Sequence, residues 1–415
     1  IGSWQPSRPF AARQPELPGR QRGTSAWGAC DHPAAASGRG KVTATTLYDQ
    51  FLFPGSQSAR DVMVATRIRE KIVYEFDDQP EAGKTMRVAP GVIWLRMPLP
   101  FALGHINLWL LEDEVGWSVI DSGVFTELTR RVWQETFRGT MQDRPVQRVI
   151  VTHLHPDHAG CAGWLTGEFG VDLWMPREEY LLCRILVADT GRPPPDAGIR
   201  FYRAAGFSPE AMSGYQKMFG MFGRYVAALP ESYRRLKDGD RIRIGATEWE
   251  VIVGRGHSPE HACLFSAELN ALISGDQLLP TISSNVSVYP TEPAANPLED
   301  WLVSLKEIKN RIPADVLVLP SHGKPFRGAH DRLQNLIDEH HDCLDDLQTM
   351  CREPRRAVDV FPALFRSPID ENNLIMATGE SVAHLNYLLH DGRLTVATDA
   401  DGVKWYRAAP RGGCL

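Results

Sequence analysis

Residues 152–158 read Thr-His-Leu-His-Pro-Asp-His. They begin at the carboxyl end of the short run 148–152, whose β-branched, apolar residues are typical of a strand buried on both faces. Ligands of open α/β sheets gather at the carboxyl ends of such strands. Three imidazoles and one carboxylate within six residues are costly to place together without a cation, because protonated rings repel one another. Imidazole and carboxylate groups are ligands of divalent metals such as Zn²⁺. The stretch therefore predicts a metal-binding loop rather than a histidine-rich surface loop.

Three more candidate ligand motifs stand further along the chain, each directly after a predicted strand and beside glycine or another turn-former. They are Gly256-His257-Ser258 after the strand 247–253, Gly275-Asp276 after 271–274, and Ser321-His322-Gly323 after 316–319. A lone histidine is most often a structural residue. Four independent strand ends that all carry ligand types, one of them with the HxHxDH pattern, instead give a strong signal for a metal site.

These motifs resemble those of the metallo-β-lactamase superfamily, across residues 86–328, and most closely its hydroxyacylglutathione hydrolase-like (glyoxalase II-like) branch. The residues that carry the resemblance are THLHPDHAG at 152–160, GHSPEH at 256–261, SGD at 274–276 and SHG at 321–323. The resemblance implies an α/β fold, the αββα sandwich, with a binuclear metal site at its edge. It implies that the first metal is held by His153, His155 and His257, the second by Asp157, His158 and His322, and that Asp276 bridges them.

Asp121, in the run Val-Ile-Asp-Ser-Gly at 119–123, matches an aspartate that lies near the site in this family. We expect its carboxylate to orient a ligand histidine rather than to bind metal itself. A turn cap is the alternative role for this residue.

The chain departs from the family pattern at several positions. Gly160-Cys161 replaces the common Gly-Gly, Glu260 stands where glycine is common, and His261 closes the motif without being counted as a ligand. True β-lactamases carry a cysteine where this chain has Asp276, so β-lactam hydrolysis is a minor expectation. The basic and tyrosine residues that bind glutathione in glyoxalase II have no counterpart in this sequence, which disfavours glutathione thioesters as substrates.

The expected chemistry is hydrolysis. Two metals that share a water lower its pKa, so a metal-bound hydroxide would be available at about pH 7. We expect a binuclear metal-dependent hydrolase that attacks an ester, thioester or lactone carbonyl of a small-molecule acyl substrate. Asp157 is the expected catalytic residue, because its carboxylate could move a proton at the site. Zn²⁺ is the expected metal, with Fe or Mn as alternatives.

Three other functions stay open. A mononuclear iron oxidoreductase resembling the persulfide dioxygenases of the superfamily would use the same ligands. A metallo-nuclease is disfavoured, because residues 331–415 carry nine basic and fourteen acidic side chains, whereas a nucleic-acid surface should be basic. A non-catalytic protein that kept the fold is disfavoured by the complete ligand set.

The composition of the chain limits its expected binding partners and its expected location in the cell. The 415 residues include 45 Lys or Arg and 51 Asp or Glu, for a net charge of −6, so there is no basic field to attract nucleic acid or an anionic membrane. No apolar run is long enough to span a membrane. Seven scattered cysteines without a CxxC pair indicate reduced thiols and a cytoplasmic location. A homo-oligomer stays open.

Three segments are expected. Residues 1–62 are expected to form a disordered tail that is rich in proline, glycine and arginine, with an organellar transit peptide or a mis-assigned start of the reading frame as the alternatives. Residues 63–328 form the catalytic domain, and a truncated chain that begins at Met63 is expected to fold. Residues 329–415 form a small C-terminal domain, predicted as helices 328–351, 355–364 and 370–388 followed by a β-hairpin, in a winged-helix-like arrangement.

Residues 176–236 interrupt the strand pattern of the catalytic domain and predict a helical insertion. An apolar stripe on one of its helices is either core or a lid over the substrate pocket; its members are Tyr215, Met218, Phe219, Met221, Phe222 and Tyr225. Tyr215, Phe219 and Phe222 are therefore candidate substrate contacts. His105, in the loop between early strands, and Asn285 and Tyr289, after Asp276, are weaker candidates. The run Val88–Leu95 predicts a single strand.

Overall fold

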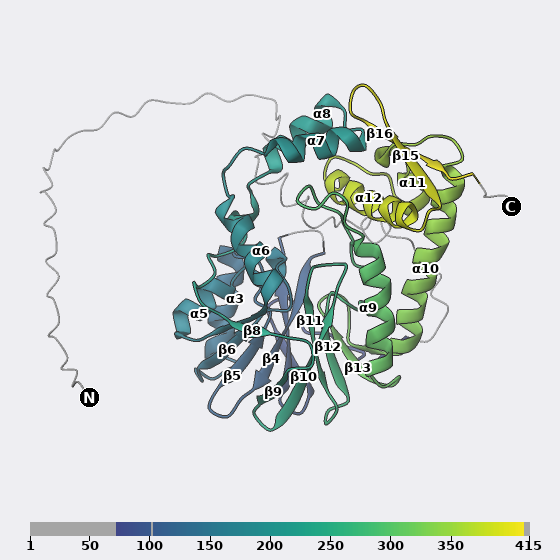
Figure 1. Ribbon diagram of the computed structural model, residues 1–415. Coiled ribbons are helices and arrows are strands. Elements are labelled where there is room, and N and C mark those ends of the chain that lie inside the picture. The colour runs from purple at the N-terminus through teal and green to yellow at the C-terminus, as the bar shows by residue number, and fades with distance from the viewer. Residues whose placement is uncertain (1–71, 101–102, 411–415) are drawn as a thin grey trace, which may run out of the picture. The chain divides into compact units, whose positions relative to one another are not determined.

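The computed structural model describes residues 72–100 and 103–410, and within them the chain forms two seven-stranded sheets and one separate hairpin. The expected tail, residues 1–62, lies outside the described residues. The two large sheets face each other, with helices on both outer sides (Figure 1). The expected αββα sandwich is therefore confirmed.

The first sheet is built from the amino-terminal half of the described chain. Its order is β2 (Thr85–Ala89), β3 (Val92–Pro98), β4 (His105–Glu112), β5 (Trp117–Ile120), β6 (Val146–Ile150), β7 (Leu173–Pro176) and β8 (Arg234–Leu236). The strands β2 to β5 are antiparallel, and β5 to β8 are parallel. Parallel neighbours need long crossovers, which are supplied by α3 (Glu127–Arg138), α4 (Pro156–Ala159) with α5 (Ala162–Phe169), and the insertion.

The second sheet follows from the remaining strands. Its order is β1 (Val73–Tyr74), β14 (Phe326–Arg327), β13 (Leu317–Pro320), β12 (Ala271–Gly275), β11 (His261–Ser266), β10 (Thr247–Gly254) and β9 (Arg241–Ile244). Only β12 and β13 pair in parallel, and α9 (Pro297–Arg311) lies between them in the chain. Because they run the same way, β12 and β13 carry their motifs, at Asp276 and His322, to the same edge.

Three hydrophobic clusters hold the layers together. The cluster between the sheets contains Trp94, Trp109 and Trp249, each almost fully buried. A second cluster packs the first sheet against α3, α5 and the insertion helix α6 (Arg177–Ala188). A third packs the second sheet against α9, α10 (Ala329–Met350) and α12 (Leu374–His390). Burial of apolar side chains on both faces of each sheet explains why their strands are so continuously hydrophobic.

The predicted single strand Val88–Leu95 is wrong. The structure divides it between β2 and β3, which pair with each other across a turn at Pro90 and Gly91. Gly91 has a φ of 71°, which a residue with a side chain seldom adopts. The alternating pattern runs through the turn, so periodicity alone does not reveal it.

The insertion is helical, in line with the prediction, but the predicted range 176–236 is too long at its end, because Arg234–Leu236 form β8 and pair with β7. Its apolar stripe also does not lie on one helix. The insertion consists of α6, α7 (Asp196–Ala205), α8 (Pro209–Met218) and the short 3₁₀ helix η1 (Phe222–Arg224). The helix α8 ends at Met218, and Gly220 turns the chain with a φ of 74°. Met221 and Tyr225 are buried in the cluster of the first sheet, so this part of the stripe is core.

The carboxyl-terminal helices are joined to the second sheet by one core. The predicted helix 355–364 is instead η2 (Ala357–Asp359) and α11 (Phe361–Leu364), with α12 and the hairpin of β15 (Leu394–Thr398) and β16 (Lys404–Ala408) after them. Pro362 explains the break, because it cannot donate the backbone hydrogen bond of a continuous helix. The comparison with a winged helix stays a prediction.

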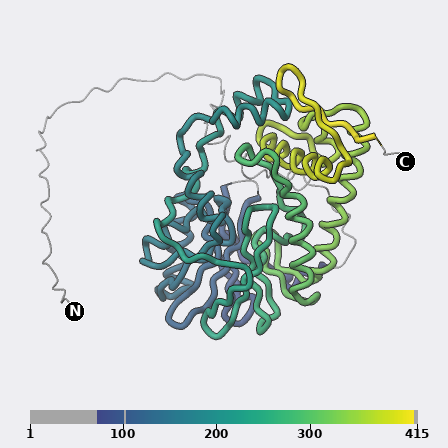
Figure 2. The backbone as a smooth tube through the Cα atoms, in the orientation of Figure 1, coloured from purple at the N-terminus to yellow at the C-terminus, as the bar shows by residue number. Residues whose placement is uncertain are grey.

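The insertion also reaches the carboxyl-terminal segment. In Figure 2 the teal tube of α7 and α8 runs from the first-sheet layer to the yellow carboxyl-terminal hairpin. Gly206, directly after α7, lies against Arg356 and Val358, and Ala205 belongs to the third cluster. Among the described helices, none combines the length and hydropathy needed to cross a membrane.

Candidate metal centre

Four loops bring candidate ligands to one edge of the sandwich. They follow β6, β10, β12 and β13, so they come from both sheets. The loop after β6 turns at once into α4, whose first residue is Pro156, a residue suited to the first turn of a helix. This turn separates His153 and His155 from Asp157 and His158, and each pair joins a different ligand group.

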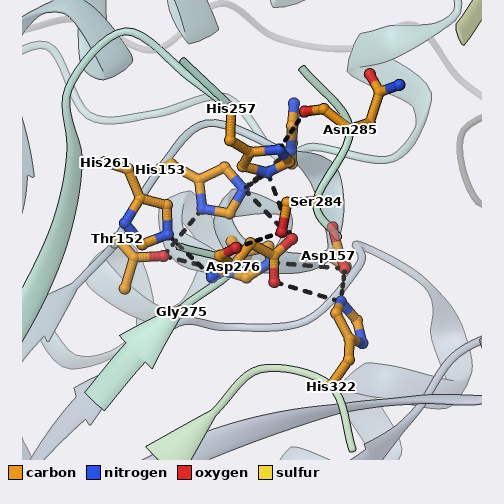
Figure 3. A network of polar contacts seen from close by, with 12 residues as sticks. Thr152, His153, Asp157, His257, His261, Gly275, Asp276, Ser284, Asn285 and His322 are labelled. Carbon is orange, nitrogen blue, oxygen red and sulfur yellow. Dashed lines mark hydrogen bonds and ion pairs between the residues drawn. The ribbon is translucent and has the colours of Figure 1, made fainter. Parts of the chain in front are cut away.

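The first group contains His153, His155, His257 and Asp276, whose ligand atoms all lie within 4.8 Å of one another. His153 Nε2 is 2.9 Å from His155 Nδ1 and 3.3 Å from His257 Nε2. The Oδ2 atom of Asp276 is 3.4 Å from His257 Nε2. Figure 3 shows His153, His257 and Asp276 facing one another, an arrangement suited to binding one cation.

The second group contains Asp157, His158 and His322, which are all buried. Asp157 Oδ2 is 3.3 Å from His322 Nε2 and 3.7 Å from His158 Nε2. Asp276 lies between the two groups, because its Oδ2 is 3.5 Å from His158 Nε2 and its Oδ1 is 3.6 Å from His322 Nε2. One carboxylate thus faces imidazoles of both groups.

Backbone carbonyls orient two of the rings. His257 Nδ1 is 2.7 Å from the carbonyl oxygen of Asn285, and His322 Nδ1 is 3.1 Å from that of His105. In both rings Nδ1 donates to the carbonyl, which leaves the lone pair of Nε2 directed at the centre. Such partners of the outer ring nitrogen fix the tautomer that a metal ligand needs.

Asp121 orients a third ring, His158. Its Oδ2 accepts a hydrogen bond from His158 Nδ1 at 2.8 Å, and its Oδ1 accepts one from the backbone N–H of Thr152 at 2.8 Å. The residue is almost fully buried and has a φ of 60°, which is unusual without glycine. This geometry matches the expected orienting role, which remains a proposal.

The donor set fits divalent metal ions. Two of its atoms, His158 Nε2 and Asp276 Oδ1, are buried and make no hydrogen bond within the described residues. Burial, aided by the neighbouring rings, holds the pKa of His153 and of His155 well below the ordinary value, so both are neutral. Burial would raise the pKa of Asp276, but the rings of His158 and His322 lower it well below its usual range. Burial would lower the pKa of His158 and of His322, but the carboxylates that face them raise both above the ordinary value, so a bound metal would take the place of a proton on each of these rings.

His261 belongs to neither ligand group. Its Nε2 accepts a hydrogen bond from the backbone N–H of Asp276 at 3.0 Å, and burial lowers its pKa to about 3. A Cβ atom at Gly275 would lie 2.4 Å from the His261 ring, and Gly275 has a φ of 51°. Glycine is therefore required where the chain turns to present Asp276.

Comparison with known families agrees with this geometry. The family model described as the metallo-beta-lactamase superfamily matches residues 102–322, which is more than half of the chain. The chain belongs to the metallo-beta-lactamase superfamily. A second family model, the metallo-beta-lactamase-like C-terminal domain, matches residues 344–409.

Three relatives illustrate the likeness. A crystal structure of a beta-lactamase domain protein from Burkholderia ambifaria is 42% identical, covers 81% of this chain and 98% of its own, and has a TM-score of 0.75. The metallo-beta-lactamase family protein TTHA1429 from Thermus thermophilus shares the fold, with a TM-score of 0.64 at 24% identity over 77% of this chain and 99% of its own. The probable metallo-hydrolase YqjP of Bacillus subtilis (strain 168) is 25% identical over 73% of this chain and 94% of its own length.

The expected substrate contacts are dispersed within the superfamily fold. Tyr215 is buried and packs on Tyr202, with ring centroids 4.3 Å apart. Phe222 is half-buried against the core of the first sheet. Phe219 is half-buried, and its ring lies 6.1 Å from that of Tyr215. Only Phe219 of these three lies outside the three core clusters and is not itself buried, and a substrate contact by any of them stays a prediction.

Two of the three remaining candidates, His105 and Asn285, contact ligand rings through their backbone oxygens. His105 opens β4 and uses its backbone oxygen to hold His322. Asn285 directs its amide away from the ligands and donates from Nδ2 to Glu380 Oε2 at 2.7 Å, so its side chain is already engaged. Tyr289 is 46% exposed in the same loop. A substrate contact by each of these side chains stays a prediction.

Sequence reasoning missed two groups that support the ligands. The Ser284 hydroxyl donates to the backbone carbonyl of Asp276. The buried carboxylate of Glu179 accepts hydrogen bonds from two ligand-bearing loops, and burial raises its pKa to about 7. Acidic residues are common in the first turn of a helix, because they interact favourably with the helix dipole. The local sequence therefore does not distinguish Glu179 from an ordinary solvent-exposed residue of a first turn.

Proposed function

We propose that this chain is a binuclear metal-dependent hydrolase of ester, thioester or lactone carbonyls. The observation that carries the proposal is Asp276, whose two oxygens face both ligand groups. His153, His155 and His257 would hold one ion, and Asp157, His158 and His322 the other. Zn²⁺ is the metal we propose, because imidazole and carboxylate ligands suit it.

The protein groups have distinct tasks in this proposal. Two divalent ions would supply an activated water and polarise the substrate carbonyl. Asp157 is almost fully buried beside His322, and we assign to it the transfer of a proton at the centre. Asp121 would keep His158 in one tautomer through the bond to Nδ1. No serine or cysteine nucleophile is needed.

Two features favour a neutral acyl substrate over a polyanion. The carboxyl-terminal segment, residues 331–415, has more acidic than basic side chains, which disfavours a nucleic-acid substrate. The insertion next to β7 is rich in aromatic side chains, which suits an apolar group. We retain as proposals a reduced, cytoplasmic-type environment, the glyoxalase II-like affinity and a homo-oligomer as the functional form.

Metal analysis of the purified protein tests the proposal. We expect two divalent ions per chain, and hydrolysis of thioester, ester or lactone substrates that is lost after chelation and restored by Zn²⁺. Asp276→Ala should remove most of the activity, because both ions would lose a ligand. A single iron per chain with oxygen uptake on persulfides would support the oxidoreductase instead. Phosphodiester cleavage would support the nuclease.

A further inference from the structure

The carboxylate of Glu179 joins two loops that are far apart in the sequence. Glu179 lies in the first turn of α6 and is fully buried. Its Oε2 accepts a hydrogen bond from the backbone N–H of Leu154 at 2.9 Å, and its Oε1 accepts one from that of Glu260 at 2.7 Å. Both oxygens are therefore engaged by backbone donors.

Glu260 returns the contact. Its Oε2 accepts a hydrogen bond from the backbone N–H of Glu178 at 2.9 Å, and its Oε1 lies 3.4 Å from Arg235 Nη2. Glu178 lies in the first turn of α6, at the start of the insertion, and Arg235 lies in β8, at its end. The loop that follows His257 is thus tied to both ends of the insertion, through the residue that stands where the family commonly has glycine.

The joined loops carry all three histidines of the first ligand group. Leu154 stands between His153 and His155, and Glu260 lies three residues after His257. A buried backbone N–H that loses its acceptor is costly, so removal of the Glu179 carboxylate would release the segments that hold these rings. Groups behind metal ligands commonly change metal affinity by about ten- to a hundredfold.

We propose that Glu179, together with Glu260, is a positioning residue for the first metal position. It sets the distance between the His153–His155 segment and the His257 loop, and so makes the insertion part of the metal centre. The inference rests on the proposed function, because it assumes that this group binds a metal. It predicts the larger effect on the first of the two ions, because Glu179 bonds to the backbone between His153 and His155 and to the His257 loop, whereas Asp157 and His158 lie beyond the turn at Pro156.

The test compares Glu179→Gln with Glu178→Gln, a matched control that makes the same change at the exposed neighbour. Dissociation constants for Zn²⁺ are measured on metal-free protein by competition with a chromophoric chelator, and Co²⁺ absorption reports the geometry of each position. Glutamine can accept only one of the two hydrogen bonds and turns an N–H₂ group towards the other donor. We expect the affinity of one ion to fall about ten- to a hundredfold in Glu179→Gln. The control should stay within about twofold, since Glu178 contributes only its backbone to the contact.

Unchanged affinity in Glu179→Gln, even with a lower melting temperature of the metal-free protein, would show that Glu179 only stabilises the fold and would overturn the inference. If Glu179→Gln does not fold, Glu179→Asp and Glu260→Ala take its place, and wild-type Zn²⁺ affinity in both would overturn it equally. A wild-type protein that binds no divalent metal would instead refute the proposed function.

Discussion

Asp121 shows how one residue can organise the centre. Its φ of 60° lies in the left-handed region, which costs about 1–3 kcal/mol for a residue other than glycine. The same turn lets one carboxylate oxygen accept from Thr152 and the other from His158. The strained backbone is thus coupled to the orientation of a candidate ligand.

At this scale we predict that Asp121→Asn weakens metal binding by about ten- to a hundredfold at the position of His158, because an amide cannot accept through both of its ends. Asparagine tolerates the left-handed backbone, so the melting temperature of the metal-free protein should change little. Asp143→Asn is the control, since Asp143 is exposed and has a φ of 56°. Wild-type metal content in Asp121→Asn would contradict the orienting role.

At the scale of elements, the insertion combines two tasks. The helix α6 packs in the core of the first sheet, and its first turn contacts the ligand loops. Beyond α8 the chain returns to that core through Met221 and Tyr225. Between these anchors, Phe219 is only half-buried. A lid over the substrate pocket stays a prediction, and the stretch around the end of α8 is the part of the apolar stripe that the core does not already account for.

We predict that Phe219→Ala lowers kcat/KM for long acyl chains more than for acetyl substrates. Each methylene that loses its apolar contact is worth about 0.8 kcal/mol, or roughly fourfold in rate. Phe222→Ala serves as the comparison, because Phe222 packs on the core and its loss should lower stability without a preference for chain length. The measurement is kcat/KM across a series of acyl lengths. An equal loss on every substrate in Phe219→Ala would rule out the lid.

At the scale of the whole described chain, the carboxyl-terminal segment supports the metal centre. Glu380, in α12, accepts a hydrogen bond from Asn285 Nδ2, and the backbone oxygen of Asn285 holds His257. Burial raises the pKa of Glu380 to about 8. The helices after residue 329 also share one hydrophobic cluster with the second sheet. These contacts argue that the two segments fold as one cooperative body.

The buried Glu380 predicts how stability depends on pH. Its pKa is higher in the folded state than the unfolded value of about 4.5, so the contribution of this group to stability falls as pH rises from about 4.5 to about 8. Glu380→Gln should remove a cost on the order of 4 kcal/mol at pH 8 and little at pH 5. The melting temperature of the metal-free variant should therefore exceed that of wild type by more at pH 8. Glu371→Gln, at an exposed position, is the control, and a gain that is the same at both pH values would contradict the prediction.

The sequence by itself determined the fold class and the candidate ligands, because both follow from short stretches of sequence: the spacing of apolar residues and the motifs that come after the strands. Each ligand type stands directly after an apolar strand, although the strands belong to two sheets and only their packing brings the four loops together. The positions of most strands and helices also follow from local periodicity. Local pattern did not predict the turns at Pro90-Gly91 and at Gly220. At the first turn the alternation of apolar residues continues from one strand into the next, and at the second an apolar stripe continues past the end of a helix.

Only the tertiary structure decided which side chains support those ligands. Glu179 meets Leu154 across 25 residues and Glu260 across 81, and Glu380 meets Asn285 across 95. A carboxylate at the start of a helix or on a helix face has the same local sequence whether it meets solvent or a buried backbone N–H. Its role depends on which loop packs against it, and that is set by the burial of distant apolar surfaces against one another.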